Sequence, residues 1–406
     1  MKRFIILFLL AAFSAGALFA MDFSGLLDSS VSLRAGAGDS PAFSYGVEEY
    51  ANIRLQAKLR EIATFYGAVN FIAAAGNDAL AASQMAVYTS AASPSNSGIT
   101  PSSFISGENY IAGIELERLY FSLNGEYLDF SGGLFRLPFG YGQVWGSSDF
   151  LNPKNPLVPD ARPRAILGGA LSWYPLDSLK LLGFGAAPRD PFSQWGGGGL
   201  VGLSLDQHWD RASIQALYSF ESPKEGSNKG IHRMGMSAKA DVEVGLVMDA
   251  LYTYNAEKNT KLDGLSFSLG LDYSFFDGNL IVLAEYLYNG AVSSTAFDGG
   301  KNLYGRHNEN YLYTGFTWRF SDFTNVSLAL ISGFNDISFT PVISFNHDLF
   351  QGATLTLSAQ IPMDRDLFSG DGNRGELGPL PPDSLQPPDQ RFGSYFNFTA
   401  KLRLRF

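Results

Sequence analysis

The last thirteen residues of the chain, 394–406 (SYFNFTAKLRLRF), decide the fold. Read alternately, they separate into an apolar series and a polar series. The apolar series is Phe396, Phe398, Ala400, Leu402, Leu404 and Phe406, and the polar series is Tyr395, Asn397, Thr399, Lys401, Arg403 and Arg405. This period of two predicts a β-strand with one apolar face and one polar to cationic face. We interpret it as the closing strand of a transmembrane barrel, with lipid on one side and water on the other.

The N-terminus predicts export. Lys2 and Arg3 precede a continuous apolar run at 4–13, and small residues follow. This order is typical of a secretory signal peptide, and the run is too short to cross a bilayer of about 30 Å as a helix. We therefore expect residues 1–20 to be a signal peptide, with cleavage after Ala17 or Ala20, and residues 21–406 to form one barrel domain.

Composition agrees with a large barrel. The chain has 406 residues, with 44 Gly, 33 Phe, 19 Tyr and no Cys. Glycine and aromatic residues in alternating segments are typical of barrels, and the lack of cysteine excludes a disulfide framework. The formal net charge of −10 argues against nucleic acid as a partner.

Apolar and polar residues alternate in segments of about ten residues, the length that a tilted strand needs to cross a membrane. In 48–60, for example, Ile53 and Leu55 alternate with Arg54 and Gln56. We expect about eighteen strands, within a range of 16–18. They lie near 24–35, 47–60, 63–75, 109–123, 126–137, 165–175, 179–188, 197–206, 211–221, 231–241, 244–255, 263–275, 280–290, 311–320, 325–334, 338–347, 354–363 and 394–406.

The connections between these segments alternate in length. Tight turns follow the even segments, and the longest loops, near 76–108, 138–164, 291–310 and 364–393, follow odd ones. Bacterial outer-membrane barrels have short periplasmic turns and long extracellular loops. The pattern predicts an all-β fold, an antiparallel up-and-down transmembrane β-barrel. A soluble propeller is disfavoured because the spacing is irregular and no blade motif repeats.

A barrel of 16–18 strands encloses an aqueous channel, and we expect no N-terminal domain to fill it. The loop at 138–164 is the candidate for narrowing the channel, because it is stiffened by prolines and is too aromatic for a solvated loop. Its candidate residues are Tyr141, Trp145, Asp149, Lys154, Asp160, Arg162 and Arg164. The alternative is an outward cap or an adhesive loop.

Alternation also places charges in the lumen. We expect a basic patch near the periplasmic end, formed by Arg54, Lys58, Arg60, Lys401, Arg403 and Arg405. Glu115 and Glu117 could form an opposite wall; Arg233, Lys239 and Arg319 would add to the basic patch, and Asp241, Asp272 and Glu285 would oppose it. The patch either concentrates anions or is only solvated at the membrane interface, so ion selectivity stays open.

Two segments resemble those of known families. The final strand resembles the C-terminal signal of Gram-negative outer-membrane proteins, and 145–156 (WGSSDFLNPKNP) is similar to a segment of porin-like families. The resemblance implies a location in the bacterial outer membrane, contact with its lipid, and recognition of Phe406 by the barrel-assembly machinery. A homo-trimer is left open.

The sequence predicts no enzyme. His208, His232, His307 and His347 lack a Ser or Asp partner on the same strand face, and no catalytic residue is identified. The acidic loop at 364–393 has Arg374 where a calcium loop would want an oxygen ligand, so we expect neither metal nor cofactor. We predict a porin-like channel for passive diffusion of small hydrophilic solutes. The alternatives are a substrate-selective channel and a non-conducting adhesin or assembly scaffold that acts through its loops.

Overall fold

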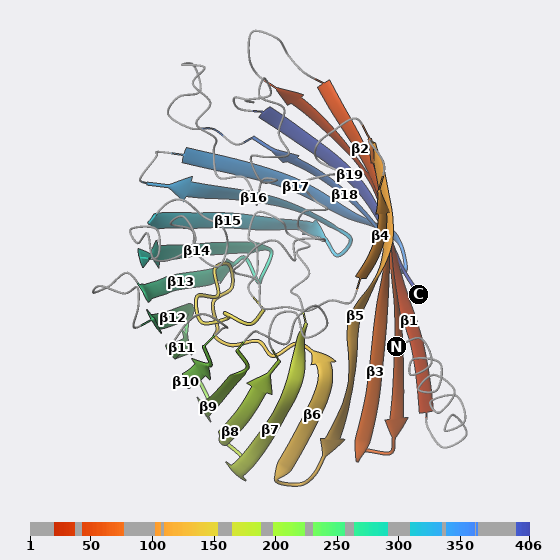
Figure 1. Cartoon of the computed structure of the whole chain (residues 1–406). Helices are drawn as coiled ribbons and strands as arrows, with labels where there is room; N and C mark the ends of the chain where they lie inside the picture. The colour runs from red at the N-terminus through yellow and green to blue at the C-terminus, as the bar shows by residue number, and fades with distance from the viewer. Residues whose placement is uncertain are drawn as a thin grey trace.

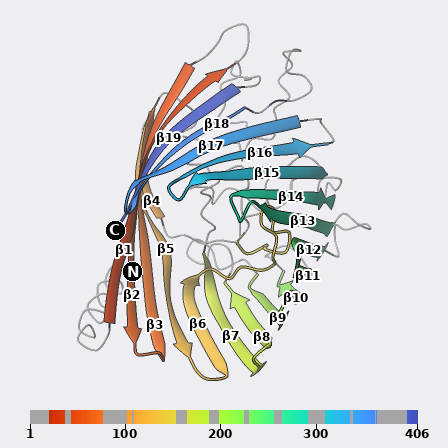
Figure 2. The ribbon, with the colours of Figure 1, turned by 180° about the vertical axis from the view of Figure 1, so that it is seen from behind.

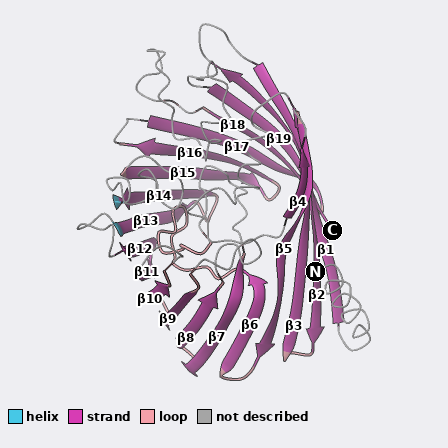
Figure 3. Cartoon of the chain, viewed as in Figure 1, coloured by secondary structure: helices cyan, strands magenta, loops and turns pink. Residues whose placement is uncertain are grey.

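The computed structural model describes residues 20–36, 43–76, 102–106, 109–152, 165–187, 198–223, 230–255, 264–290, 309–334, 338–361, 363 and 395–406. These residues form one antiparallel sheet that curves into a barrel (Figure 1). The strands, coloured magenta in Figure 3, are β1 Ala20–Gly36, β2 Phe43–Leu59, β3 Ala63–Gly76, β4 Ser102–Ser106, β5 Tyr110–Asn124, β6 Leu128–Phe135, β7 Ile166–Leu176, β8 Leu179–Ala186, β9 Leu200–Trp209, β10 Ala212–Glu221, β11 Ile231–Val242, β12 Val244–Asn255, β13 Leu265–Phe275, β14 Leu280–Asn289, β15 Asn310–Ser321, β16 Thr324–Gly333, β17 Ser338–Phe350, β18 Ala353–Gln360 and β19 Tyr395–Arg405.

The sheet closes between its first and last strands. β1 pairs with β2 on one edge and with β19 on the other, from Leu26 opposite Arg405 to Gly36 opposite Tyr395. Beyond this register, the amide of Gly25 donates to the carbonyl of Phe406 at 2.7 Å, and the amide of Phe406 donates back at 3.1 Å. Eighteen of the nineteen strands close the barrel, and the short β4 pairs only with β5. The closed barrel of eighteen strands confirms the predicted fold class and strand count.

Connection lengths alternate as expected. Turns such as 60–62, 125–127 and 243 join strands at one end of the barrel, which we call the turn end. The connections at the other end, the loop end, include 136–165, 290–309 and 361–394. Which end faces the cell exterior stays a prediction.

The two faces of the wall differ in chemistry. On β13, Leu269 and Leu271 are 49% and 47% exposed on the outer face, whereas Ser268, the residue before Leu269, is 1% exposed on the inner face. On β2, the polar neighbours Tyr50 and Asn52 are likewise buried inside. An apolar exterior around a polar interior is the arrangement of a barrel that lies in lipid. Among the described residues, no helix is long and apolar enough to cross a bilayer.

Exposed aromatic side chains gather at the turn end. Examples are Tyr127, Trp209, Phe276, Phe323 and Phe350, each within or next to a turn. Aromatic rings are enriched at the interfaces of a membrane because one side meets acyl chains and the other meets water. We expect the turn end to lie at such an interface.

β4 differs from the sequence prediction, which placed 102–106 inside the long loop 76–108. It pairs with β5 at Ile111–Glu115, whereas β6 pairs with β5 only at Leu119–Asn124. β3 occupies the other edge of β5 throughout. β4 therefore extends the β5 edge where β6 has already left the wall. Five residues are too few for a clear alternation, so the sequence does not reveal this strand.

The close packing of β6 on β5 requires glycine at position 133. Gly133 has a φ of +126°, and a Cβ there would lie 2.4 Å from the carbonyl oxygen of Leu119. We expect Gly133→Ala to destabilise the barrel by about 1–3 kcal/mol, the cost of a strained backbone residue. Gly183→Ala is the matched control, since its Cβ would meet Leu203 at an ordinary 3.7 Å. The measurement is the temperature at which the folded barrel loses its heat-modifiable migration on gels. We expect this temperature to fall below that of the unsubstituted protein for Gly133→Ala and not for Gly183→Ala. Equal temperatures for the two variants would contradict the prediction.

Candidate functional site: the inward loop and the inner wall

The chain leaves the wall after β6 and enters the barrel. Both views show residues 136–152, the gold loop that follows β6, inside the ring of strands (Figures 1 and 2). Pro138 lacks an amide hydrogen, and Gly140 and Gly146 have φ values of +85° and +51°, so the segment cannot continue as a regular strand. Almost all of its residues from Gly142 to Asn152 are buried.

One apolar patch of the inner wall receives the first and last parts of this loop. Phe139, Phe150 and Leu151 pack against wall side chains that include Leu182, Phe184, Leu200, Leu217 and Leu251. The rings of Phe139 and Phe150 are stacked with centroids 6.0 Å apart, and Phe139 lies 5.1 Å from Phe184. These strands carry apolar residues on the lumen side, where most of the barrel carries polar ones. Apolar residues at these lumen-facing positions of the sequence could have indicated that another segment packs there.

Two carboxylates hold the middle of the loop. Asp249 on β12 accepts hydrogen bonds from the amides of Tyr141 and Gly142, both at 2.9 Å. Glu285 on β14 accepts from the amides of Gln143, Val144 and Trp145 at 2.9–3.0 Å. Five successive backbone amides are thus satisfied by two anionic side chains. Hydrogen bonds of this charge-assisted kind are short and stronger than neutral ones.

Trp145 anchors the middle of the loop to the strands β14–β16. Its side chain is completely buried, its indole nitrogen donates to the carbonyl oxygen of Glu285 at 3.0 Å, and its ring lies 5.4 Å from that of Tyr311. Val144 and Trp145 pack with Leu287, Tyr311 and Ile331 in a second apolar cluster. The loop therefore reaches from β6 to the strands β14–β16 through the interior of the barrel.

Tyr141 and Asp149, two of the residues predicted to narrow the channel, make different contacts in this loop. The Tyr141 ring lies 5.2 Å from Lys239 Nζ, and burial raises the pKa of its phenol above the ordinary value. Asp149 is buried and accepts from the amide of Asn152 at 3.0 Å, and Asn152 Oδ1 accepts from the amide of Leu137 at 2.8 Å. Lys154, Asp160, Arg162 and Arg164 lie outside the described residues.

A polar network lines the inner wall of β2, β3 and β5 and includes Arg136, the first residue after β6. Asn52 donates to Glu117 and Asn70 donates to Glu115, at 2.6 and 2.8 Å. Arg136 Nη2 lies 2.7 Å from Glu117, and Arg118 Nε lies 3.4 Å from the same carboxylate. The register shift between Ala68 and Val69 adds a residue to β5 there, which brings Glu117 and Arg118 to the same face. Neither Arg118 nor Arg136 was identified from the sequence. A bulge is invisible to simple alternation, which explains Arg118, and Arg136 follows the last residue of β6.

The cations expected to form one basic patch are spread along the wall. Arg403 forms a two-pronged ion pair with Asp28, with both distances 2.8 Å. Arg54 donates to Asn52 beside the Glu117 network. Arg60 lies in the exposed turn after β2, with a φ of +51°. Lys401 and Arg405 pair with Ser30 and Leu26 of β1, whereas Lys58 pairs with Ala20, beyond the end of β19. Glu115 and Glu117 lie beside Arg54 instead of opposite it.

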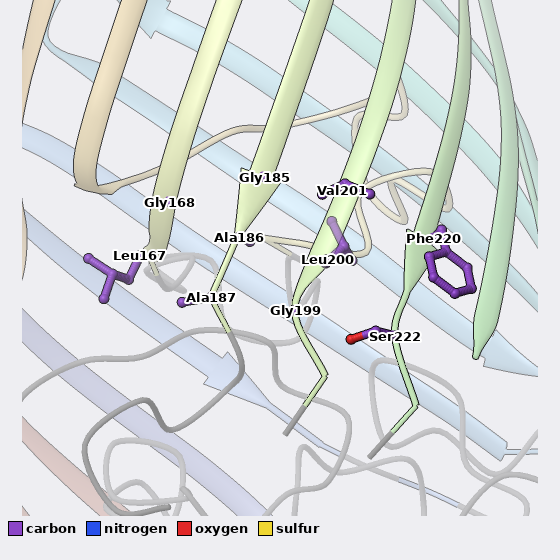
Figure 4. Close-up of a pocket in the computed structure, with 10 residues that line it drawn as sticks. All are labelled: Leu167, Gly168, Gly185, Ala186, Ala187, Gly199, Leu200, Val201, Phe220 and Ser222. Carbon is purple, nitrogen blue, oxygen red and sulfur yellow. The ribbon is translucent and has the colours of Figure 1, made fainter. Parts of the chain in front are cut away.

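A surface depression lies at the loop ends of β7–β10 (Figure 4). It has a volume of about 600 Å³ and is lined by Leu167, Gly168, Gly185, Ala186, Ala187, Gly199, Leu200, Val201, Phe220 and Ser222. The absence of side chains on its glycines leaves the space, and Ser222 supplies its one polar side chain. Such a lining has no acid, base or nucleophile pair for catalysis. In the described part of the chain, no group of three His, Asp or Glu residues is placed to hold a metal ion.

The role of Glu285 leads to a testable prediction. Glu285→Gln removes the charge that three loop amides share, and should cost the loop about 2 kcal/mol of anchoring. Hydrogen exchange of the amides at 143–145 should then become roughly thirtyfold faster. Asp272→Asn is the control, because the described contact of Asp272 with the loop is one hydrogen bond from the Gln143 side chain, at 2.8 Å. Unchanged exchange in Glu285→Gln would contradict the anchoring role.

Comparison with known proteins identifies the fold. No protein-family model matches the sequence, and no curated protein sequence matches it. Among solved structures, OpdQ of Pseudomonas aeruginosa is 12% identical with a TM-score of 0.53, covering 95% of this chain and 98% of that one. OccAB1 and OccAB3 of Acinetobacter baumannii are 10% and 11% identical, with TM-scores of 0.53 and 0.52, covering 95% of this chain and 96% and 99% of theirs. At this identity the likeness shows the fold, and it confirms that the chain is a porin-like β-barrel of the type found in outer-membrane porins.

Proposed function

We propose that the protein is an outer-membrane channel through which small hydrophilic solutes diffuse passively. The observation that carries this proposal is the combination of an eighteen-strand barrel with a polar inner wall and one loop anchored inside it. A barrel of this size is too wide for its side chains alone to fill. The loop then narrows the water-filled path without any moving part or cofactor.

Fold similarity supports the location in the outer membrane, since the similar structures are porins of that membrane. Recognition of the C-terminal strand by the assembly machinery and a homo-trimeric state remain predictions. The inner wall lacks a catalytic arrangement among the described residues, which favours transport over catalysis.

The charged groups beside the inward loop favour anions, whereas Asp241 and Asp348, which are exposed on the inner face near the turn end, oppose them. The side chains of Arg118 and Arg136 are 20% and 25% exposed, whereas Glu117 between them is only 9% exposed. On the other wall, Asp249 and Glu285 are completely buried and their carboxylates face the loop amides. A solute that passes the inward loop therefore meets guanidinium groups before carboxylates. In a narrow pore with low-dielectric walls, such an excess raises the local anion concentration.

A substrate-selective channel is the second candidate. The guanidinium of Arg118 lies 4.6 Å over the Tyr66 ring, which stacks on Tyr120 at 5.3 Å. Aromatic faces beside fixed charges are suited to hold a planar or cyclic solute. Saturation of the channel current by such a solute, lost in Tyr66→Ala, would favour this candidate over passive diffusion.

Single-channel recording in a planar bilayer tests the proposal. We expect stable conductance steps and, under a salt gradient, a reversal potential whose sign shows that anions are more permeant than cations. The double substitution Arg118→Gln and Arg136→Gln should lower the anion-to-cation permeability ratio roughly twofold to fivefold, as expected for two exposed charges that together contribute about 0.5–1 kcal/mol. Arg60→Gln, in the exposed turn, should leave the ratio unchanged. Absence of conductance from a folded barrel would contradict the channel and favour an adhesin or scaffold.

A further inference from the structure

Glu49 is a carboxylate on the outer face of the barrel. It pairs across β2–β3 with Ala73 and across β1–β2 with Ser29, and it is exposed. Its neighbours on the same face of β2, Tyr45 and Val47, are 53% and 39% exposed, whereas Tyr50 on the opposite face is buried. The side chain of Glu49 therefore points away from the lumen.

No other Asp, Glu, Lys or Arg of the described strands lies on the outer face. The remaining charged residues of these strands share the face of the buried inner residues, as Asp28, Glu115, Asp249 and Glu285 do. The described contact of Glu49 is one hydrogen bond, donated by the Ser29 hydroxyl at 2.6 Å. A single hydroxyl does not satisfy two carboxylate oxygens. An ionisable residue in contact with lipid is costly, and such residues mark functional sites.

A shallow apolar groove of about 460 Å³ begins beside this carboxylate. Small side chains, those of Ala51, Ala73 and Ala112, form part of its lining, and Phe71, Ile105 and Ile114 flank them with exposures of 40%, 67% and 51%. Small residues in a membrane-facing surface let the backbone of another protein approach closely, and a polar side chain beside them adds a directed contact. An acyl chain needs no such arrangement.

We propose that the groove and Glu49 form a docking surface for another membrane protein that presents a lysine or arginine side chain to Glu49. Charge complementarity determines the class of partner. The described strands of a second copy of this chain offer no lysine or arginine on their outer face, so the proposal takes a different protein as the partner. The proposal concerns the outer wall and does not depend on conduction through the lumen.

Site-specific photo-cross-linking tests the proposal in cells that produce the full chain. A benzophenone amino acid replaces Ala73 in the groove, and Ala250, on the outer face of β12, serves as the control position. We expect one protein adduct from position 73 and none from position 250. Glu49→Gln should lower its yield about tenfold or more, because it leaves the partner's cation unpaired. Glu49→Asp should restore much of the yield.

Identification of the cross-linked peptide completes the test. A lysine or arginine next to the cross-linked site supports the proposal, and Glu49→Lys combined with replacement of that cation by glutamate should restore the adduct. An adduct with a second copy, an adduct with lipid alone, no adduct at all, or a yield unaffected by Glu49→Gln would each overturn it. Heat-modifiable migration and unchanged conductance of Glu49→Gln show that the barrel itself is intact.

Discussion

Every strand of this protein depends on one constraint, the need to satisfy backbone amide and carbonyl groups where there is no water. In lipid a sheet meets this need only by closing on itself. Closure happens between β1 and β19, and the terminal Phe406 completes it with two backbone hydrogen bonds to Gly25. A Cβ at position 25 would lie 2.3 Å from the Phe406 ring, so glycine there leaves room for the aromatic terminus over the seam.

Closure of eighteen strands creates an interior that wall side chains cannot fill, and the loop after β6 occupies part of it. The loop brings backbone amides that would otherwise be buried without partners. Asp249 and Glu285 accept five of them in succession. Burial of these two carboxylates is tolerated because the amides replace water around them. β4 takes the position on β5 beyond the point where β6 leaves the wall.

The same arrangement separates the charges of the protein by accessibility. Carboxylates of the β12 and β14 walls are covered by the loop, whereas Arg118 and Arg136 remain partly exposed on the wall of β5 and β6. The net charge of −10 therefore does not predict the sign of the field that a solute meets in the lumen. On the outer face of the described strands, an apolar surface surrounds one carboxylate, that of Glu49. The position of a charged side chain thus decides whether a solute in the lumen or a molecule at the outer wall can meet it.

The amino-acid sequence alone determined the class of fold, the strand count, the alternation of turns with long loops and which face points outward in the strands that alternate without a bulge. All of these follow from local periodicity, because side chains alternate strictly along a strand. Tertiary structure alone decided the pairing of the loop amides with Asp249 and Glu285, the bulge that brings Arg118 to Glu117, and the position of β4. These features join residues that are far apart in the chain or shift the register by one residue, and periodicity carries no information about either.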